Sequence, residues 1–355
     1  MSRYAAAHLN PAGPNDARPT AAQIVEDEGV AGKLKGKIIV ITGVSSGIGI
    51  ETARALAPTG ASFFLLARDL KKAEKALADF FDPSRMELVQ LDLESFDSAR
   101  KAAATILSKT DKINILINNA GIMAVPDLRL TKDGHELQFE TNHLSHFLFF
   151  ELLKPALLAA VTPDFHSRVV NVSSVAHLMG GINDSDNYNY QKGGYTPWGA
   201  YAQSKTANVY MANEIERRYG AQGLHATSLN PGGIDTGLSK FLDPSVLEAY
   251  KSQKELLNLM KSPEQGAATT VWAAIGQEWA TKGGKYLNDC TVPPVVPEAR
   301  SAAGADSTSE AAPADGNPNA DSMTGPYHAV HAYDVEAATR LWEDSLRIVG
   351  LAETA

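Results

Sequence analysis

A tyrosine and a lysine spaced four residues apart, Tyr201 and Lys205, are suited to proton transfer at a carbonyl oxygen. In a helix these two side chains lie on the same face. An unperturbed tyrosine has a pKa of about 10, and it becomes an acid–base group at neutral pH when a nearby cation favours its phenolate. Ser174, at the end of an apolar run, would orient and polarise the carbonyl. These residue types predict carbonyl chemistry, provided that the chain also binds a hydride donor.

The tyrosine–lysine spacing alone does not select Tyr201, because it occurs three times. Tyr188 and Lys192 lie in a polar stretch rich in Asn and Gly, which predicts a loop without fixed i, i+4 geometry. Tyr250 and Lys254 come after the last strand that the pattern locates, in a segment expected to cover the cleft. Only the Tyr201 pair lies in a helical pattern that directly follows the serine-ending strand.

Strands and helices must alternate to position these residues. Short apolar runs predict parallel strands at 37–42, 61–66, 86–91, 113–117, 168–172 and 225–229. Helical spacing separates them, at 49–56, 69–80, 95–108, 134–159 and 201–218. Further helices are expected at 245–259, 263–275 and 335–349. This order predicts an α/β fold, a Rossmann-type doubly wound parallel sheet of about seven strands with helices on both faces, in a single domain.

Composition divides the chain into four parts. Residues 1–34 are polar and rich in Pro and Gly, which predicts a flexible N-terminal arm with a short helix near 21–28. Residues 35–297 hold the Rossmann domain. Residues 298–326 are a low-complexity tract that cannot bury enough apolar surface to fold, so we expect disorder there. Residues 327–355 are expected to pack back on the domain through a helix.

A glycine-rich turn between the first strand and the first helix predicts a nucleotide site. Gly43, Gly47 and Gly49 permit a tight turn and a close approach to a pyrophosphate, which the helix N-terminus would bind. The spacing differs from G-x-G-x-x-G in its middle, and a purely structural turn is the alternative. The other residues of the turn expected to contact the cofactor are Ser45, Ser46 and Ile48.

The end of the second strand distinguishes the two nicotinamide cofactors. An acidic residue there would bind a ribose 2′-hydroxyl, whereas an arginine would accommodate a 2′-phosphate. Here Ala67 stands at the usual carboxylate position and Arg68 follows it, and Lys71 and Lys72 add positive charge. The sequence therefore predicts NADP(H). NAD is the alternative, because the carboxylate of Asp69 could bind the ribose 2′-hydroxyl unless it caps the next helix.

Polar residues at other strand ends would converge on the same crevice, because ligands of such sheets collect beyond the carboxyl ends of the strands. Asp92 could accept a hydrogen bond from the adenine amino group, or be a solvated turn residue. Asn119, Ala120 and Gly121 offer an amide and small side chains beside the cofactor.

Taken together, these motifs resemble the short-chain dehydrogenase/reductase family, in its retinol-dehydrogenase-like and WW-domain-oxidoreductase-like branch. The resemblance covers about residues 35–297 and 332–351. It is carried by Thr42–Gly49, Ala67–Asp69, Leu91–Leu93, Asn118–Gly121, Thr141–Phe147, Arg168–Ser174, Tyr201–Lys205 and Asn230–Gly232.

The resemblance implies a role for each matching residue. Tyr201 would be the general acid/base, Lys205 its electrostatic partner and a ribose ligand, and Ser174 the residue that orients the carbonyl. Asn142 would hold the water of a proton relay behind Lys205. The remaining implied cofactor contacts are Leu93, Val172, Pro231, Gly232 and Thr236.

Two expanded segments and one substitution depart from the family pattern. The loop at 177–200 and the tract at 297–326 leave the substrate class open, since loops rather than the fold determine it. Four aromatic residues of the first segment form either an aromatic substrate wall or a lid packed on itself: Tyr188, Tyr190, Tyr195 and Trp198. Ser145 replaces a common glycine, which we expect to change only packing. The membrane-anchoring N-terminus frequent in the branch is not expected here.

Bulk properties exclude several functions. A net charge of −9 argues against nucleic acid. The single cysteine, Cys290, excludes an internal disulfide and a thiolate metal cluster, and it fits a small buried residue. No histidine cluster has metal-ligand spacing, so no metal is expected, and His143 and His146 are predicted to pack or to form hydrogen bonds. No apolar stretch is long enough to span a membrane, and we expect a cytoplasmic protein.

The sequence therefore predicts an NADP(H)-dependent oxidoreductase that reduces a ketone or aldehyde, or oxidises the alcohol, of a fairly hydrophobic small molecule. One alternative is a regulatory nucleotide-binding module without turnover. Another is a different reaction at the same site, such as imine reduction or dehydrogenation–isomerisation. The sequence leaves open whether the protein forms a homodimer. The resemblance makes this an option, because helices like those at 134–159 and 201–218 form dimer interfaces in many relatives.

Overall fold

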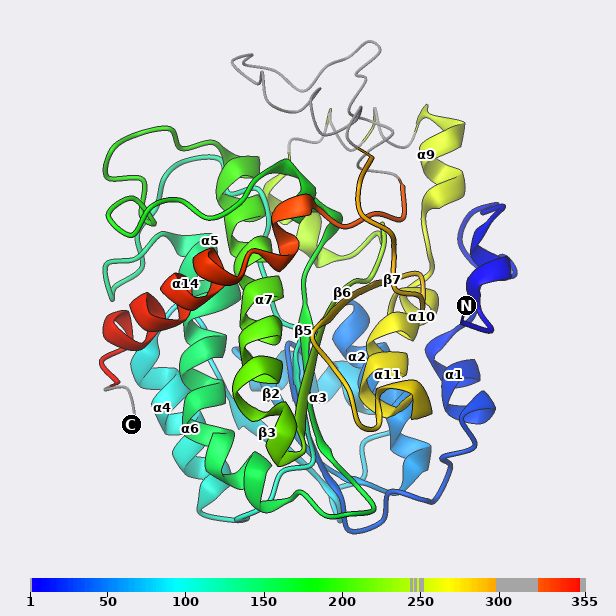
Figure 1. Ribbon diagram of the computed structural model, residues 1–355. Coiled ribbons are helices and arrows are strands. Elements are labelled where there is room, and N and C mark those ends of the chain that lie inside the picture. The colour runs from blue at the N-terminus through cyan, green and yellow to red at the C-terminus, as the bar shows by residue number, and fades with distance from the viewer. Residues whose placement is uncertain (1, 243–244, 246–247, 249–251, 298–324, 352–355) are drawn as a thin grey trace.

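The computed structural model describes residues 2–242, 245, 248, 252–297 and 325–351. Its centre is a seven-stranded parallel sheet in the order β3-β2-β1-β4-β5-β6-β7 (Figure 1). The strands are β1 (Ile38–Thr42), β2 (Ser62–Ala67), β3 (Met86–Gln90), β4 (Ile115–Asn118), β5 (Ser167–Val172), β6 (Leu224–Asn230) and β7 (Lys285–Asn288). The predicted doubly wound sheet is confirmed. The strand order reverses between β1 and β4, where such folds bind their ligands.

Helices cover both faces of this sheet. The α-helices are α1 (Ala21–Asp27), α2 (Ile48–Leu56), α3 (Leu70–Leu77), α4 (Phe96–Leu107), α5 (Leu137–Phe139), α6 (Ser145–Ala159), α7 (Pro197–Tyr219), α9 (Lys254–Leu259), α10 (Pro263–Gly266), α11 (Ala268–Ile275) and α14 (Val335–Ile348). The 3-10 helices include η1 (Ala5–His8), η4 (Val175–Met179) and η6 (Gly237–Phe241), and η3 (Glu140–Leu144) is a π-helix.

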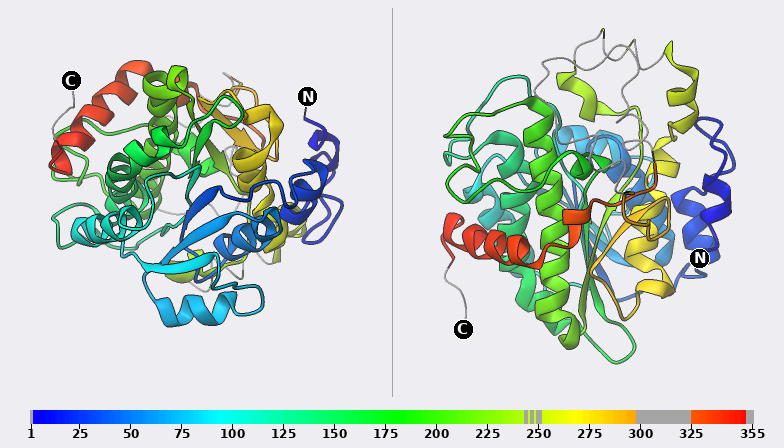
Figure 2. Two further views of the ribbon diagram at one scale, coloured as in Figure 1. Left: turned by 90° about the horizontal axis from the view of Figure 1, so that it is seen from below. Right: turned by 45° about the horizontal axis from the view of Figure 1, so that its top comes forward.

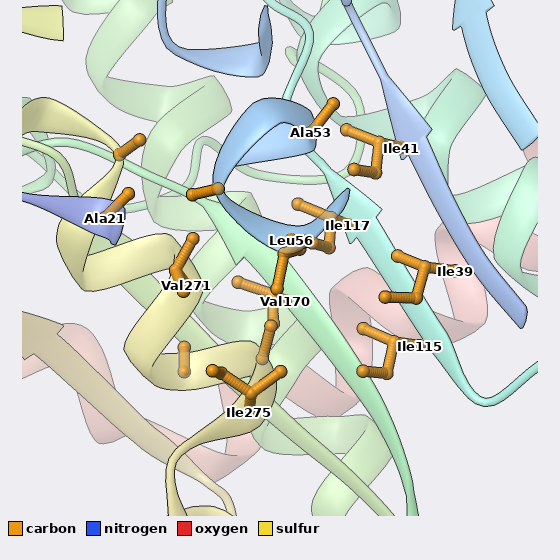
Figure 3. Close-up of a cluster of buried hydrophobic side chains, with 14 of the residues drawn as sticks. Ala21, Ile39, Ile41, Ala53, Leu56, Ile115, Ile117, Val170, Val271 and Ile275 are labelled. Atoms are coloured by element: carbon orange, nitrogen blue, oxygen red, sulfur yellow. The ribbon is translucent and has the colours of Figure 1, made fainter. Parts of the chain in front are cut away.

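The strands bury both of their faces, which explains why they form nearly continuous apolar runs. Ile39 and Ile41 face a cluster with α2 and α11, as Figure 3 shows, whereas Val40 between them faces the opposite cluster. The first cluster also contains α1 and α3, and the second contains α4, α6, α7 and α14. This packing fixes the strand ends against each other, and therefore the loops that follow them.

The N-terminal segment packs on the domain, where the sequence predicted a flexible arm. Thr20 caps α1 by accepting a hydrogen bond from the Gln23 amide. Ile24 and Val25 of α1 are buried in the cluster that contains α11, and Figure 2 shows this segment alongside α11. Each such buried side chain contributes roughly 1.5–3 kcal/mol, which offsets the cost of ordering a polar segment.

The C-terminal helix α14 lies across α6 and α7 (Figure 2). Asp334 caps it, and Trp342 packs edge-on against Phe147 at 4.9 Å and against Phe150 at 6.1 Å. Helix α14 therefore covers part of the surface of α6 and α7, the two helices whose sequences left a homodimer interface possible. The tract at 298–326, expected to be disordered, lies outside the described residues except for Gly325 and Pro326.

The helix expected at 134–159 begins three residues later and is not uniform. Glu136 caps it by accepting hydrogen bonds from the amides of Gln138 and Phe139, so the first helical residue is Leu137. The π-helix η3 then interrupts the α-helix before α6 continues to Ala159. Single π-turns of this kind are frequent at functional sites, and this one contains Asn142.

Candidate active site

Many of the predicted site residues gather at the carboxyl edge of the sheet, because they follow neighbouring strands. The glycine-rich turn follows β1, Asn119 to Gly121 follow β4, Ser174 follows β5 and Pro231 follows β6. Arg68 and Asp92 follow β2 and β3, on the other side of the point where the strand order reverses. The structure thus places the residues expected to take part in the reaction near the ends of β4, β5 and β6. The residues expected to distinguish the cofactors lie at the ends of β2 and β3.

The glycine-rich turn requires its glycines. Gly43 and Gly47 have φ values of 80° and 68°, in the region that favours glycine. A Cβ at Gly49 would lie 2.3 Å from the Gly43 carbonyl oxygen and 2.6 Å from Nδ2 of Asn119. The three glycines therefore leave backbone without side chains just before and within the first turn of α2, which begins at Ile48. A turn of this shape, ahead of the N–H groups of a nine-residue helix, fits a pyrophosphate.

A buried hydrogen-bond network joins this turn to the neighbouring loop. The Thr42 hydroxyl oxygen accepts from the amides of Asn119 (2.9 Å) and Ala120 (3.0 Å). Its third partner is Nε2 of His146 at 2.9 Å, so the hydroxyl proton goes to that nitrogen. His146 therefore carries its own proton on Nδ1 and donates it to the Asn142 carbonyl at 3.0 Å. Burial lowers the pKa of His146 to about 4, which keeps the ring neutral.

The side chain of Asn142 braces the site from the π-helix η3. Its Oδ1 accepts from the Ile122 amide, and its Nδ2 donates to the Ile122 carbonyl and to the Ser204 hydroxyl, all at 2.9 Å. Both amide protons are thus used. A Cβ at Gly121 would lie 3.0 Å from Oδ1 of Asn142 and 3.4 Å from Nζ of Lys205, so these groups surround that glycine. Asn142 connects the loop after β4 to α7, and its role in a water relay stays a prediction.

Helix α7 presents Tyr201 and Lys205 on one face. Thr196 caps the helix, and Pro197 occupies its first turn. Nζ of Lys205 lies 5.5 Å from the centroid of the Tyr201 ring and donates to the Val172 carbonyl at 3.0 Å. Both side chains are buried. The i, i+4 relation expected from the sequence is present.

Burial dominates the acid–base properties of this pair. It raises the pKa of Tyr201 to about 12, and the hydrogen bond from Ser174 opposes that rise. It lowers the pKa of Lys205 to about 7. The sequence led us to expect that the lysine would favour the phenolate, whereas in this structure burial has the largest influence on the pKa of Tyr201 and disfavours the phenolate. At neutral pH Tyr201 is therefore a protonated phenol, which can donate its proton.

The other tyrosine–lysine pairs do not form a site in the described part of the chain. The Tyr188 hydroxyl is buried and donates to Asp344 at 2.7 Å. Lys192 is exposed and pairs with Asp186 at 2.5 Å. Tyr250 lies outside the described residues.

The residues expected at the adenosine end have partners of their own. Arg68 is exposed and forms an ion pair with Glu94 at 2.8 Å. Asp69 caps α3 by accepting from the Lys72 amide, so the capping alternative is confirmed. Asp92 accepts from the Glu94 amide at 3.1 Å, and the Leu93 carbonyl accepts from Ser145. Thr236 caps η6 and lies over the glycine-rich turn, 3.3 Å from a Cβ built on Gly47.

The aromatic residues of the loop at 177–200 pack on the protein itself, and a role as a substrate wall stays a prediction. Tyr190 and Tyr195 pack edge-to-face at 5.3 Å, and the Tyr195 hydroxyl donates to the Val125 carbonyl. Trp198 instead lies edge-on to the Tyr201 ring at 6.0 Å. The loop therefore packs partly on itself and extends one aromatic side chain to the catalytic candidate.

His177 has a role that sequence reasoning did not identify. Its Nδ1 donates to the Ser174 carbonyl at 2.7 Å, and its Nε2 accepts from the Ala329 amide at 3.1 Å. Burial lowers the pKa of His177 to about 3, so the ring stays neutral. The C-terminal segment is thereby fixed to the residue that would orient the substrate. Only the proximity of His177 to Ser174 in the sequence could have pointed to this contact.

The described residues include neither a cluster of metal ligands nor a membrane-spanning helix. Within them, no group of three His, Cys, Asp or Glu side chains is arranged to bind a metal ion. Among those same residues, no helix has both the length and the apolar character needed to cross a bilayer. Cys290 is buried, and burial raises its pKa to about 12, as expected of an inert thiol.

Comparison with known proteins identifies the family. The family model described as short chain dehydrogenase matches residues 37–246. Short-chain dehydrogenase/reductase prx1 of Penicillium roqueforti is 46% identical over 351 residues, which cover 99% of this chain and 96% of that protein. Human retinol dehydrogenase 13 is 34% identical over 323 residues, which cover 90% of this chain and 86% of that protein. A solved structure of a putative uncharacterized protein from Mycobacterium paratuberculosis has a TM-score of 0.64 at 28% identity. The match covers 92% of this chain and 98% of that one. The chain is thus an oxidoreductase of the short-chain dehydrogenase/reductase family, in its retinol-dehydrogenase-like branch.

Proposed function

We propose that this protein is an NADP(H)-dependent reductase of ketones or aldehydes on fairly hydrophobic small molecules, or a dehydrogenase of the corresponding alcohols. The observation that carries the proposal is the arrangement of Tyr201 and Lys205 on α7 beside Ser174, which follows β5, next to the loop that holds the glycine-rich turn. Its hydrophobic substrate class is supported by Trp198 beside Tyr201. It is also supported by the similarity to a protein named for retinol, which is an apolar alcohol.

The chain's own residues supply proton transfer and orientation. A bound NADPH supplies the hydride. Tyr201, protonated at neutral pH, donates its phenolic proton to the carbonyl oxygen of the substrate. Ser174 orients that oxygen from the end of β5. Nζ of Lys205 uses one proton for the Val172 carbonyl, which leaves its remaining donor capacity for ribose hydroxyls.

Positive side chains at the end of β2 support NADP(H) over NAD. Burial lowers the pKa of Lys240, and Arg68 and Lys72 lower it further, which places Lys240 in the field of those two cations. A 2′-phosphate would reduce their mutual repulsion and accept hydrogen bonds from the Arg68 guanidinium. Because Asp69 is engaged as the cap of α3, the carboxylate that would favour NAD has another partner.

Replacing Arg68 with Ala is expected to weaken NADPH binding about tenfold, or ~1.4 kcal/mol, and to leave NADH binding unchanged. The expected loss is at the low end for a charged hydrogen bond because the Arg68 side chain is 59% exposed. Titration of each cofactor by fluorescence measures both dissociation constants.

Arg3→Ala is the matched control for this substitution. Arg3 is 54% exposed and forms an ion pair with Glu28, away from the strand ends. The control should bind both cofactors as the wild type does. Equal NADPH affinity in Arg68→Ala and in the wild type would contradict the assignment of the 2′-phosphate site.

A further inference from the structure

Arg18 of the N-terminal segment binds the end of a helix about 240 residues later in the chain. Its side chain is 3% exposed. Its Nη1 donates to the Leu259 carbonyl at 2.9 Å, and its Nη2 donates to the carbonyls of Met260 and Asn258. These carbonyls end α9, where helices leave backbone acceptors without internal partners and carry partial negative charge. Arg18 therefore caps α9 from outside that helix.

Further contacts fix the position of Arg18 itself. Asp16 accepts from its Nε at 2.9 Å, and the Gly13 carbonyl accepts from its Nη2 at 3.0 Å. The Gly13 amide donates to the Asn258 carbonyl at 2.9 Å. Nε2 of Gln265 donates to the Arg18 carbonyl at 3.0 Å. The segment at 13–18 and the segment at 258–265 thus form one hydrogen-bonded unit.

This unit in turn contacts the loop that follows β6. The Lys261 amide donates to the Gly233 carbonyl at 2.8 Å, and Nζ of Lys261 donates to the Pro231 carbonyl at 3.2 Å. Asp289 accepts from the same Nζ at 2.6 Å. His8, from η1, lies 3.2 Å from Asp289. Arg18, through the carbonyls at 258–260, and His8, through Asp289, therefore both reach the Pro231 loop by way of Lys261.

We propose that the N-terminal segment, through Arg18 and His8, fixes the position of the loop at 231–234 and so determines how tightly the nicotinamide half of the cofactor and the substrate are held. Arg18 is a positioning residue, because it acts through the segment at 258–261 and touches neither ligand. The identity of those ligands rests on the proposed function. The coupling between the segments rests on the contacts above.

The test compares Arg18→Ala, Arg18→Lys and His8→Ala with Arg3→Ala, whose partners lie within the N-terminal segment and α1. NADPH and 2′,5′-ADP, which lacks the nicotinamide half, are titrated against each full-length protein. Arg18→Ala should weaken NADPH binding and raise the substrate KM roughly tenfold, less than the roughly 100-fold loss that a 1 Å misplacement of reacting groups can cause. The affinity for 2′,5′-ADP should stay unchanged. Arg18→Lys should recover part of the loss, because it keeps the charge without the planar fork.

Hydrogen exchange of the same proteins separates this inference from the proposed function. The amide of Lys261 should exchange faster in Arg18→Ala than in Arg3→Ala, whether or not the wild type turns over any substrate. His8→Ala should weaken NADPH binding less than Arg18→Ala, and it decides the outcome if Arg18→Ala does not fold. Unchanged exchange at Lys261 would overturn the proposal. So would an equal loss of affinity for NADPH and 2′,5′-ADP, because that result would mean that the segment only stabilises the fold.

Discussion

Replacing Tyr201 with Phe is expected to lower kcat/KM for carbonyl reduction by about 10³-fold, within the range that a positioned proton donor contributes. The substitution removes one hydroxyl and leaves the ring in its packing against Trp198. Ser174 and Lys205 keep their backbone contacts. NADPH affinity should therefore change little, and initial rates at fixed NADPH measure the effect on the chemical step.

Tyr188→Phe is the matched control, because it removes a hydroxyl from another buried tyrosine with a lysine four residues later. Its hydroxyl donates to Asp344, so the variant should lose about 1 kcal/mol of stability and keep its activity. In the wild type, alcohol oxidation needs the phenolate. Since the pKa of Tyr201 is raised, that rate should increase with pH through the alkaline range, whereas reduction should not. Full activity of Tyr201→Phe would contradict the proposed mechanism.

Replacing Gly49 with Ala is expected to weaken NADPH binding by about 10- to 100-fold, since forcing an extra methyl group into a packed site typically costs about 1–3 kcal/mol. The new Cβ would lie 2.3 Å from the Gly43 carbonyl oxygen and 2.6 Å from Nδ2 of Asn119. The first atom belongs to the turn that would hold the pyrophosphate, and the second donates hydrogen bonds to the Thr42 and Gly43 carbonyls of that turn, so the turn or the start of α2 must shift. Isothermal titration with NADPH measures the loss.

Gly181→Ala controls for the added methyl group itself. The nearest atom to a Cβ at Gly181 is Cδ2 of His331 at 3.9 Å, an ordinary contact, and its φ is not in the left-handed region. This variant should bind NADPH as the wild type does. If Gly49→Ala also binds NADPH normally, the glycine-rich turn is a structural turn and not the pyrophosphate site.

The fold could be predicted because its signals are local. Six apolar runs located six strands, since a strand buried on both faces needs an uninterrupted apolar sequence. The seventh, β7, consists of Lys285, Tyr286, Leu287 and Asn288. Four residues with polar ends leave too little pattern to locate it. Similarly, α1 was expected as a helix, but nothing in its own sequence specified that it packs on α11.

The candidate site was predictable as a set of strand ends, but not in its electrostatics. Tyr201 and Lys205 followed from helical spacing and from the strand that ends near Ser174. The pKa of about 7 for Lys205 arises from burial, which depends on the complete fold. The interruption of the helix at Asn142 by a π-turn likewise has no recognisable sequence signal.

Contacts between segments that are distant in the sequence could not be predicted from it. Arg18 binds carbonyls at 258–260, and His177 binds the amide of Ala329. Backbone carbonyls and amides are the same at every position, so no residue type at the far end reveals these partners. His146 was expected to pack or to form hydrogen bonds, and it forms two, but its link between Thr42 and Asn142 required coordinates.

The most direct test of the account is transfer of deuterium from NADPH, labelled at both C4 positions, to a panel of ketones and aldehydes. Mass spectrometry of the products shows where the label goes. At least one alcohol with a single deuterium on its carbinol carbon is expected, formed by the wild type and about 10³-fold more slowly by Tyr201→Phe. NADPH binding without a labelled alcohol from any member of the panel would contradict the proposed function, and would favour a nucleotide-binding module without turnover.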